Sequence, residues 1–528
     1  MTLRTDFHTH ETVIDLRDVE SRRTRFAESQ SMDIGTGLEQ TARTHGGKIA
    51  LRCGAATLTY AALFDASGRL AGALLRRGFR AGDTLAVLCE NNLELLQLYY
   101  AAARIGLVFV PLNQSISARE VAYVMAHSDA KLLLHDAALR DVADAAAVPS
   151  LRALLSDIFA GRPAHDTVPP AVDRSREDFL VIYTSGSTGT PKAVVFDQQG
   201  ERAGNQSLAE LWGIGSGDVT LVALPMGFLY GLSTAAGTAL QMGGEVVVLR
   251  RFHPGEVLHA LVDAKATVFH GVPTMFSMML DYAEEQDLDI DLSRVRLLIS
   301  AGAPLGEELR DRFEARFRKR LDNYYALTEA RPIFGRPWNY EGVLPRGTSG
   351  RLAPGVEVRI RDVRGETRST GEQGEVLVRA PAMLKRYHKD EALTLQVLQD
   401  GWFATGDLGY RDAAGNYFLT GRIKDIIIRG GANVAPAEVE EVLSSHPAVH
   451  AAAVVGVPDV TFGEVPVAYL VPRGDGRPPT DELTTYCAGR LAAFKVPTAF
   501  VFAETLPLGP TGKVDKKALM QMWSEGQR

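Results

Sequence analysis

The chain has 528 residues, of which 46% are hydrophobic and 23% charged, and its formal net charge is −7. These values are ordinary for globular proteins, and without a basic stripe they argue against binding of nucleic acid. A chain of this length is expected to form several domains or subdomains, each with a core of its own.

Cysteine usage and the N-terminus both favour a cytoplasmic protein. Cys53, Cys89 and Cys487 are scattered and odd in number, so we expect free thiols rather than disulfides or a zinc site. Residues 1–20 lack the apolar core of a signal peptide, and no apolar run approaches the roughly 18 residues that span a membrane. The sequence leaves the oligomeric state open, a homodimer included.

The first part of the chain alternates helices and strands. Helical spacing covers 59–78, 93–106 and 119–128, and short apolar runs typical of strands cover 83–90, 107–113 and 131–136. The same alternation returns at 179–304. A β-α-β rhythm predicts parallel sheets covered by helices, so we expect an α/β fold.

The pattern changes twice along the rest of the chain. The segment 160–178 is rich in proline and charge and is expected to be a linker. From about residue 345, short strands and turns predict a small β-rich subdomain, and an α+β segment follows "GRIKDIIIRGG".

The stretch "DFLVIYTSGSTGTPKAVVF" places a polar loop between two apolar runs. The loop carries the hydroxyl residues Thr184, Ser185, Ser187 and Thr188, the glycines Gly186 and Gly189, and Lys192. Hydroxyls, exposed backbone N–H groups and a lysine together suit phosphate oxygens. The loop is not a Walker A motif, because Pro191 and Ala193 stand where that motif has a glycine and a magnesium-binding hydroxyl. A plain polar turn between two strands is the alternative that the loop alone leaves open.

Further loops carry polar side chains of the same kind. "NYYALTEA" offers Thr328 and Glu329, whose oxygens suit magnesium, and "WFATGDLGY" places Asp407 in a predicted tight glycine turn, where it could accept from ribose hydroxyls. "GRIKD" offers Arg422 for phosphate or ribose oxygens, and "LPLGPTGKVDKKAL" offers Lys513. Taken singly, each also fits a helix cap, a surface ion pair or a solvated lysine.

Taken together, the motifs follow one order. "YTSGSTGTPK", "YALTEA", "TGD", "GRIKD" and "PTGKVDKKAL" occur in the order and at the spacing of adenylate-forming enzymes, so the chain resembles that superfamily of acyl- and aryl-CoA synthetases, adenylation domains and luciferases. The resemblance covers about residues 30–520 and implies a large N-terminal domain, with a β-barrel-like subdomain, and a small mobile C-terminal domain. The expected ranges are an extension at 1–29, an N-terminal domain at 30–423 with subdomains at about 30–165, 175–344 and 345–423, and a C-terminal domain at 424–528.

The resemblance implies that the protein binds ATP and Mg²⁺. The β- and γ-phosphates are expected at the polar loop with Lys192 as a mobile counter-charge, adenine between the "AGAP" segment and Tyr325, and the ribose at Asp407. The residues implied for ATP or AMP are Thr184, Ser185, Gly186, Ser187, Thr188, Gly189, Lys192, Gly302, Ala303, Pro304, Asn323, Tyr324, Tyr325, Asp407 and Arg422.

The resemblance also implies two chemical steps. A carboxylic acid attacks the α-phosphorus and pyrophosphate leaves, with Lys513 bridging the acid and the ribose, Thr328 at the α-phosphate and Glu329 binding Mg²⁺. The C-terminal domain then turns about Lys424 and brings the segment with Gly430 and Gly431 to the site, where a thiol attacks the acyl-adenylate.

The segments "RGGANVAPAEVE" and "FKVPTAFVF" look like those of stand-alone CoA ligases of the benzoate, coumarate and medium-chain type. CoA is therefore the expected acceptor. The pantetheine thiol of a separate carrier protein, an unusual nucleophile and a catalytically inactive ligand-binding relative are the alternatives, and the joint presence of the five charged motif residues argues against the last.

The acyl pocket departs from the family pattern. Phe228 replaces the usual histidine, Ala326 replaces a common glycine and should shorten the pocket, and Arg331 replaces a small residue. Arg331 could meet an anionic substrate tail or form a surface ion pair, and the nearby methionines could be core residues or a pliable wall. We expect a compact apolar or aryl acid. The predicted pocket residues are Phe228, Leu229, Met275, Met278, Ala326, Arg331 and Ile333.

Overall fold

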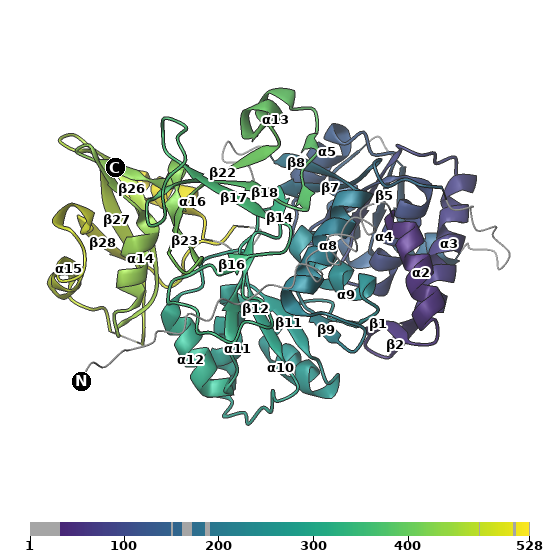
Figure 1. The fold of residues 1–528 in the computed structure, drawn as a ribbon, viewed down its shortest axis with the longest axis horizontal. Helices are drawn as coiled ribbons and strands as arrows, with labels where there is room; N and C mark the ends of the chain where they lie inside the picture. The colour runs from purple at the N-terminus through teal and green to yellow at the C-terminus, as the bar shows by residue number, and fades with distance from the viewer. Residues whose placement is uncertain are drawn as a thin grey trace, which may run out of the picture.

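The structure, a computed structural model, describes residues 32–148, 151–160, 172–184, 191–474, 476–509 and 514–526. Two large mixed sheets and a smaller antiparallel sheet form the greater part of the described chain, and a separate α+β unit lies at one end, on the left of Figure 1. The predicted α/β class with a smaller C-terminal unit is confirmed.

The first large sheet has the strand order β20-β8-β7-β4-β3-β5-β6. Its strands are β3 (Thr84–Leu88), β4 (Val108–Leu112), β5 (Leu132–His135), β6 (Leu151–Leu154), β7 (Asp178–Thr184), β8 (Lys192–Asp197) and β20 (Arg386–Tyr387). Strands β3 to β7 pair in parallel, as predicted. Strand β8 pairs antiparallel with β7, because a short connection can form a hairpin but no crossover. Strand β20, from far along the chain, pairs antiparallel with β8.

Helices and a short 3₁₀ turn pack around this sheet. They are α2 (Ile34–His45), α3 (Tyr60–Arg76), α4 (Leu93–Ile105), α5 (Ala118–His127), η1 (Ala137–Leu139), α6 (Arg140–Ala145), α7 (Leu155–Ala160) and α8 (Gln198–Trp212). Alternate residues of β3 enter different cores: Leu85 and Val87 join the larger one, and Ala86 and Leu88 join one that includes α5. The sheet is thus buried on both faces, which explains its continuous apolar strands.

The second large sheet has the order β13-β12-β11-β9-β10-β1-β2. Its strands are β1 (Ile49–Cys53), β2 (Ala56–Thr59), β9 (Val219–Val222), β10 (Glu245–Val248), β11 (Val268–Gly271), β12 (Leu297–Ser300) and β13 (Leu321–Asn323). The π-helix η2 (Tyr230–Gly237) and the helices α9 (Thr238–Gln241), α10 (Pro254–Asp263), α11 (Pro273–Glu285) and α12 (Glu307–Phe317) accompany it.

The two large sheets exchange strands along the chain. Strands β1 and β2 precede the whole first sheet in sequence but belong to the second, and β7 and β8 belong to the first. The sheets therefore do not coincide with the contiguous subdomains expected at 30–165 and 175–344, since each of these ranges contributes strands to both sheets. Long connections bring strands together that are distant in sequence.

The smaller sheet is antiparallel and lies where a β-rich subdomain was predicted. Its strands are β17 (Glu357–Arg361), β18 (Gly374–Arg379), β21 (Leu398–Gln399), β22 (Trp402–Arg411) and β23 (Tyr417–Arg422), with helix α13 (Glu391–Val397) nearby. Two short antiparallel pairs flank it: β14 (Ala330–Arg331) with β19 (Ala382–Met383), and β15 (Phe334–Gly335) with β16 (Arg351–Leu352).

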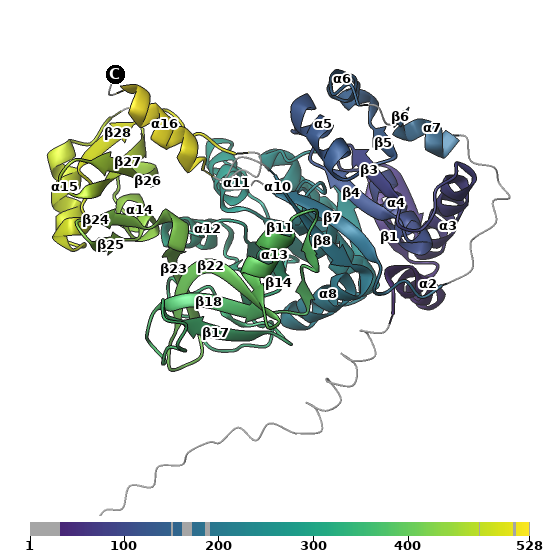
Figure 2. The ribbon, with the colours of Figure 1, turned by 90° about the horizontal axis from the view of Figure 1, so that it is seen from above.

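The C-terminal unit has its own sheet and core. Its elements are η3 (Ile423–Asp425), β24 (Ile427–Arg429), β25 (Ala432–Val434), α14 (Pro436–Ser444), β26 (Val449–Asp459), β27 (Gly463–Pro472), α15 (Thr480–Ala488), η4 (Ala493–Lys495), β28 (Ala499–Phe502) and α16 (Lys516–Gly526). Figure 2 shows this unit set apart from the first large sheet. One ion pair, from Arg473 Nη2 to Glu308 Oε1 at 2.5 Å, ties it to α12. Across the part of the chain that is described, no helix combines the length and apolarity needed to cross a membrane.

Candidate active site

The loop between β13 and β14 is the centre of the candidate site. It begins after Asn323 and ends at Ala330, and its two halves contact different parts of the molecule. The hydroxyl of Tyr325, near its start, donates to the carboxylate of Asp407 on β22, whereas Glu329, near its end, accepts from Tyr387 on β20. The loop therefore connects the smaller sheet to the edge of the first large sheet.

Asp407 is held between two partners in the smaller sheet. It is 4% exposed, lies opposite Arg422 in the β22–β23 pair, and its Oδ1 is 2.9 Å from Arg422 Nε. The predicted tight glycine turn is wrong: Asp407 lies inside strand β22, next to Gly406, which has φ +71°, where the pairing with β18 shifts its register. Burial, and then the charge of Asp407, raises the pKa of Tyr325 well above its usual range, so its hydroxyl stays a donor.

The other end of the loop meets the strands that flank the polar phosphate-type loop. Tyr387 donates to Glu329 Oε1 at 2.8 Å, and Lys192 Nζ lies 5.4 Å from the centroid of the Tyr387 ring. Thr184 and Lys192 are paired residues at the ends of β7 and β8. Burial, followed by the charge of Glu329, raises the pKa of the Tyr387 hydroxyl. The predicted residues Ser185, Gly186, Ser187, Thr188 and Gly189 lie outside the described residues.

At the expected adenine site, the neighbouring residues Tyr324 and Tyr325 have different surroundings. Gly302 has φ +86°, a conformation that L side chains rarely adopt, so the "AGAP" segment turns sharply there. The side chain of Tyr324 instead packs in the core, 5.0 Å from Trp212 between ring centroids, and its hydroxyl has no partner among the described residues. Tyr325 stacks on Phe334 at 5.5 Å. Of the two tyrosines, Tyr325 is the one whose hydroxyl reaches Asp407.

The predicted acyl-pocket residues divide into buried and exposed sets. Phe228 is half-buried just before η2, and Leu229 and Ile333 are buried. Met275 belongs to the core beneath α11, as the packing alternative predicted. Met278 is 50% exposed, so core packing does not explain it.

Arg331 fits neither of the two predicted roles. It is 1% exposed and pairs with Glu201 of α8, itself fully buried, at 2.7 Å. Its guanidinium also donates to Asn205 at 3.1 Å and to Ser233 of η2 at 2.6 Å. The reason is strand alternation: β14 pairs with β19 and directs Arg331 away from solvent, toward α8.

Sequence reasoning missed three residues of this region. Glu201 and Asn205 lie four residues apart on the buried side of α8, a spacing of polar residues on an apolar face that signals a buried network. Tyr387 carried no signal of its own, because its role comes from a contact with a distant segment.

The C-terminal residues of the prediction lie in exposed connections. Lys424 is exposed in η3. Gly430 and Gly431 have φ of +58° and +85° and form the two-residue turn of the β24–β25 hairpin, a geometry that requires positive φ at both positions. Lys513 lies outside the described residues.

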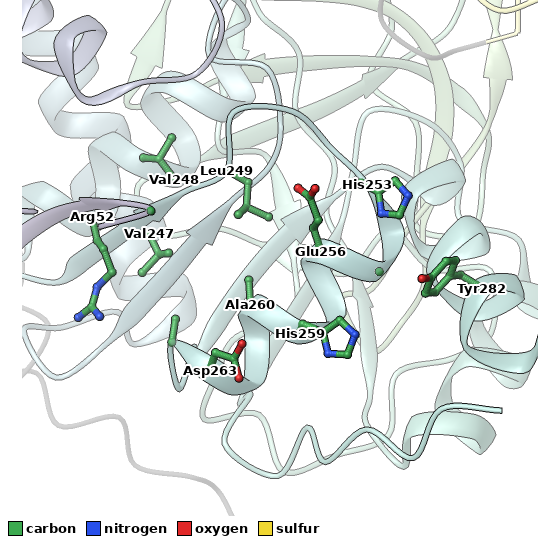
Figure 3. Close-up of a pocket in the computed structure, with 13 residues that line it drawn as sticks. Arg52, Val247, Val248, Leu249, His253, Glu256, His259, Ala260, Asp263 and Tyr282 are labelled. Atoms are coloured by element: carbon green, nitrogen blue, oxygen red, sulfur yellow. The ribbon is translucent and has the colours of Figure 1, made fainter. Parts of the chain in front are cut away.

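A cavity of about 640 Å³ lies apart from this site, between β10 and α10 (Figure 3). His253, Glu256, His259 and Asp263 of α10 and its flank face it, together with Arg52. None of the predicted site residues lines it.

The donor set around Glu329 fits a magnesium ion that arrives with phosphates. Among the described residues, no group of three or more His, Cys, Asp or Glu could hold a metal ion by itself. Glu329 offers one carboxylate, fixed by Tyr387, and Thr328 a neighbouring hydroxyl. Magnesium commonly takes one or two carboxylates and completes its shell with substrate phosphates and water.

Comparisons with known proteins show the family of the chain. The AMP-binding enzyme family matches residues 38–388, and the AMP-binding enzyme C-terminal domain matches residues 438–513. A feruloyl-CoA synthase of Amycolatopsis sp. is 34% identical over 92% of this chain and 98% of its own. ScoC of Streptomyces coeruleorubidus, a fatty acid–[acyl-carrier-protein] ligase, is 32% identical over 91% of this chain and 94% of its own.

A solved structure shares the whole architecture. The o-succinylbenzoate CoA synthetase MenE of Bacillus subtilis, in complex with its acyl-adenylate intermediate, superposes with a TM-score of 0.83 at 30% identity, covering 92% of this chain and 97% of that one. The resemblance drawn from the motifs is thereby confirmed. The chain belongs to the AMP-binding enzyme family, within the adenylate-forming superfamily of acyl- and aryl-CoA synthetases.

Proposed function

We propose that this protein uses ATP to activate a compact apolar or aryl carboxylic acid as an acyl-adenylate and then transfers the acyl group to CoA. One observation carries the proposal: a single loop contacts the Asp407–Arg422 pair through Tyr325 and the Tyr387–Lys192 pair through Glu329. A nucleotide laid along this loop would meet a carboxylate suited to ribose hydroxyls at one end. At the other it would meet a lysine and a metal-binding carboxylate suited to phosphates.

In the proposed first step, a carboxylate oxygen of the acid bonds to the α-phosphorus of ATP. The bond between the α-phosphorus and its bridging oxygen breaks, and pyrophosphate leaves. Thr328 and Glu329 would hold the magnesium-bound phosphates, and Mg²⁺ would supply neutralisation of charge on the phosphate oxygens. Lys513 would balance the charge that develops between the acid and the ribose, and Asp407 would fix the ribose in place.

In the proposed second step, the C-terminal unit turns about Lys424 and presents the hairpin turn at Gly430 and Gly431. The thiol sulfur of CoA bonds to the acyl carbon, its proton is lost, and the bond between that carbon and the phosphate oxygen breaks, which releases AMP. The exposed position of Lys424 between β23 and β24 supports this, because a joint needs few packed neighbours.

The proposed class of acid follows from charge and size. Phe228 is apolar and offers no hydrogen bond to a carboxylate, and Ile333, the other bulky apolar residue predicted for the pocket, is fully buried. The charge of Arg331 is already compensated by Glu201. An acid with a second anionic group would therefore find no uncompensated arginine at this position, which favours neutral tails.

A pyrophosphate-release screen tests the proposal. Aryl, short, medium-chain and dicarboxylic acids are each supplied with ATP and Mg²⁺, with and without CoA, and thioester is measured separately. We expect release with aryl or compact neutral acids and thioester only with CoA. Release with no acid of the panel would contradict the function, and a preference for long-chain acids or diacids would contradict the acid class alone.

A carrier-protein acceptor is the second candidate, and the similarity to ScoC favours including it. A holo carrier protein replaces CoA in the same assay. Acyl transfer to its pantetheine in preference to CoA would assign the acceptor differently while leaving the adenylation step in place.

A further inference from the structure

Tyr387 joins two groups that the proposed function places at the phosphates of ATP. We infer that Tyr387 is a positioning residue for magnesium-bound ATP, whose hydroxyl orients the Glu329 carboxylate and whose ring supports Lys192. The inference rests on the proposed function, because it assigns a role at the same nucleotide site.

The backbone around Tyr387 is fixed on both sides. It lies on β20, which pairs with β8, the strand that begins at the end of the phosphate-type loop. Just before it, Lys385 Nζ is 2.9 Å from Asp178 Oδ1 at the start of β7. Just after it, the N–H of His388 donates to the carbonyl of Ala193 on β8 at 2.8 Å. A segment far along the chain is thus held to both strands of the hairpin that carries the loop.

The side chain has two separate contacts. Tyr387 is 4% exposed, and its hydroxyl donates to Glu329 Oε1 at 2.8 Å. The Nζ atom of Lys192 lies over its ring, 5.4 Å from the centroid, within the range of a cation–π contact. In addition, the backbone N–H of Tyr387 donates to Thr394 Oγ1 at 2.9 Å, and this bond holds the strand against α13.

The hydroxyl and the ring of Tyr387 have different roles, the first at Glu329 and the second at Lys192. A hydrogen bond to one carboxylate oxygen fixes the plane of Glu329, so that its other oxygen keeps a constant direction toward a bound cation. The ring gives Lys192 a favourable surface without a competing carboxylate, so the ammonium stays available to phosphate oxygens. Loss of the hydroxyl should therefore affect magnesium, and loss of the ring should also affect the phosphates.

The test compares Tyr387→Phe and Tyr387→Leu in the full chain by calorimetric titration with ATP at limiting and saturating Mg²⁺. Tyr387→Phe should raise the Mg²⁺ concentration needed for half-maximal ATP affinity by about 10- to 100-fold, as outer-shell substitutions typically do. Its ATP affinity at saturating Mg²⁺ should stay near that of the wild type. Tyr387→Leu should weaken ATP binding at saturating Mg²⁺ as well.

Tyr60→Phe is the matched control. The Tyr60 hydroxyl is also buried, and it donates to the carbonyl of Gly244 at 2.6 Å, away from the site. Each Phe variant removes one buried hydroxyl and its hydrogen bonding, so thermal unfolding should show a comparable loss of stability, whereas only Tyr387→Phe should change the Mg²⁺ dependence. In a Glu329→Gln background, Tyr387→Phe should have little further effect.

Two results would overturn these assignments, and they are distinguishable. If wild-type ATP binding depends on Mg²⁺ and Tyr387→Phe follows the same dependence, the inference on Tyr387 fails and the proposed function stands. If the wild-type protein binds ATP with no Mg²⁺ dependence, or does not bind it, both fail.

Discussion

At the scale of single residues, Arg331 differs most from expectation, because it forms a buried ion pair with Glu201 whose disruption should strongly lower the stability of the fold. Both side chains are almost fully removed from water, and Asn205 and Ser233 share hydrogen bonds with them, while Arg331 Nε has no hydrogen-bond partner among the described residues. A buried pair of this kind contributes little net stability, but removal of one partner leaves an uncompensated charge. The network also joins β14, which follows the loop that carries Glu329, to η2, which follows Phe228.

Glu201→Ala should therefore lower the free energy of unfolding by about 3–5 kcal/mol, because Arg331 would remain buried and charged. Asp129→Asn is the matched control, since it also removes one charge of an ion pair, with Lys389 at 2.7 Å, but Asp129 is 71% exposed and asparagine tolerates its φ of +52°. That surface pair should contribute no more than about 1 kcal/mol. Urea unfolding of the three proteins measures the difference, and equal losses for both variants would contradict a buried, charged network.

At the scale of elements, local sequence patterns predict many of the helices and strands, but they predict little of which strands pair with one another. The helical spacing at 93–106 corresponds to α4, which begins after the N-cap Asn92 and ends at Gly106 with φ +71°. Such signals are local, whereas the place of β1 and β20 in their sheets depends on partners distant in sequence. The site divides in the same way: motif residues such as Glu329 and Asp407 were predicted, but Tyr387 was not.

His270 on β11 gives an element-scale prediction on pH. It is 1% exposed, packed between Trp212 and Tyr230, and neither ring nitrogen has a hydrogen-bond partner among the described residues. Burial lowers its pKa from 6.5 to about 3. The unfolded chain therefore binds more protons than the folded one between these two values, so stability should fall as the pH decreases below about 6.5.

The contribution of His270 is measured by difference. The contribution of His270 to the unfolding free energy changes by up to about 1.4 kcal/mol per pH unit between its folded and unfolded pKa values. His270→Leu removes the titrating group, so its unfolding free energy should depend less steeply on pH than that of the wild type between neutral pH and about pH 5. Identical slopes for the two proteins in urea unfolding followed by tryptophan fluorescence would show that His270 is not buried in its neutral form.

At the scale of the whole molecule, the C-terminal unit meets the rest of the chain through an ion pair and through helix α14, which lies against strand β23. The ion pair between Arg473 and Glu308 is about one-third exposed on both sides. Exposed pairs contribute roughly 0–1 kcal/mol, so this contact would not prevent rotation. Lys424 lies in the short exposed connection between the two parts.

Lys424→Pro should separate the two half-reactions, because proline fixes φ at the proposed joint and removes a backbone donor. Acyl-adenylate should still form from ATP and the acid, whereas thioester formation should collapse. Lys424→Ala removes the same charge but keeps φ free, and it should retain thioester formation. Normal thioester output from the proline variant would show that no rotation at this residue is needed.

Strand β20 also has a consequence for how the chain reaches this fold. By pairing with β8 it covers part of what would otherwise be the edge of a six-stranded sheet. An uncovered edge presents a row of unpaired N–H and C=O groups, a template for association with other chains. During synthesis the whole apolar hairpin of β7 and β8 emerges well before β20 is made. The nascent protein therefore passes through an aggregation-prone interval, which ends only when residues 386–387 arrive and complete the sheet.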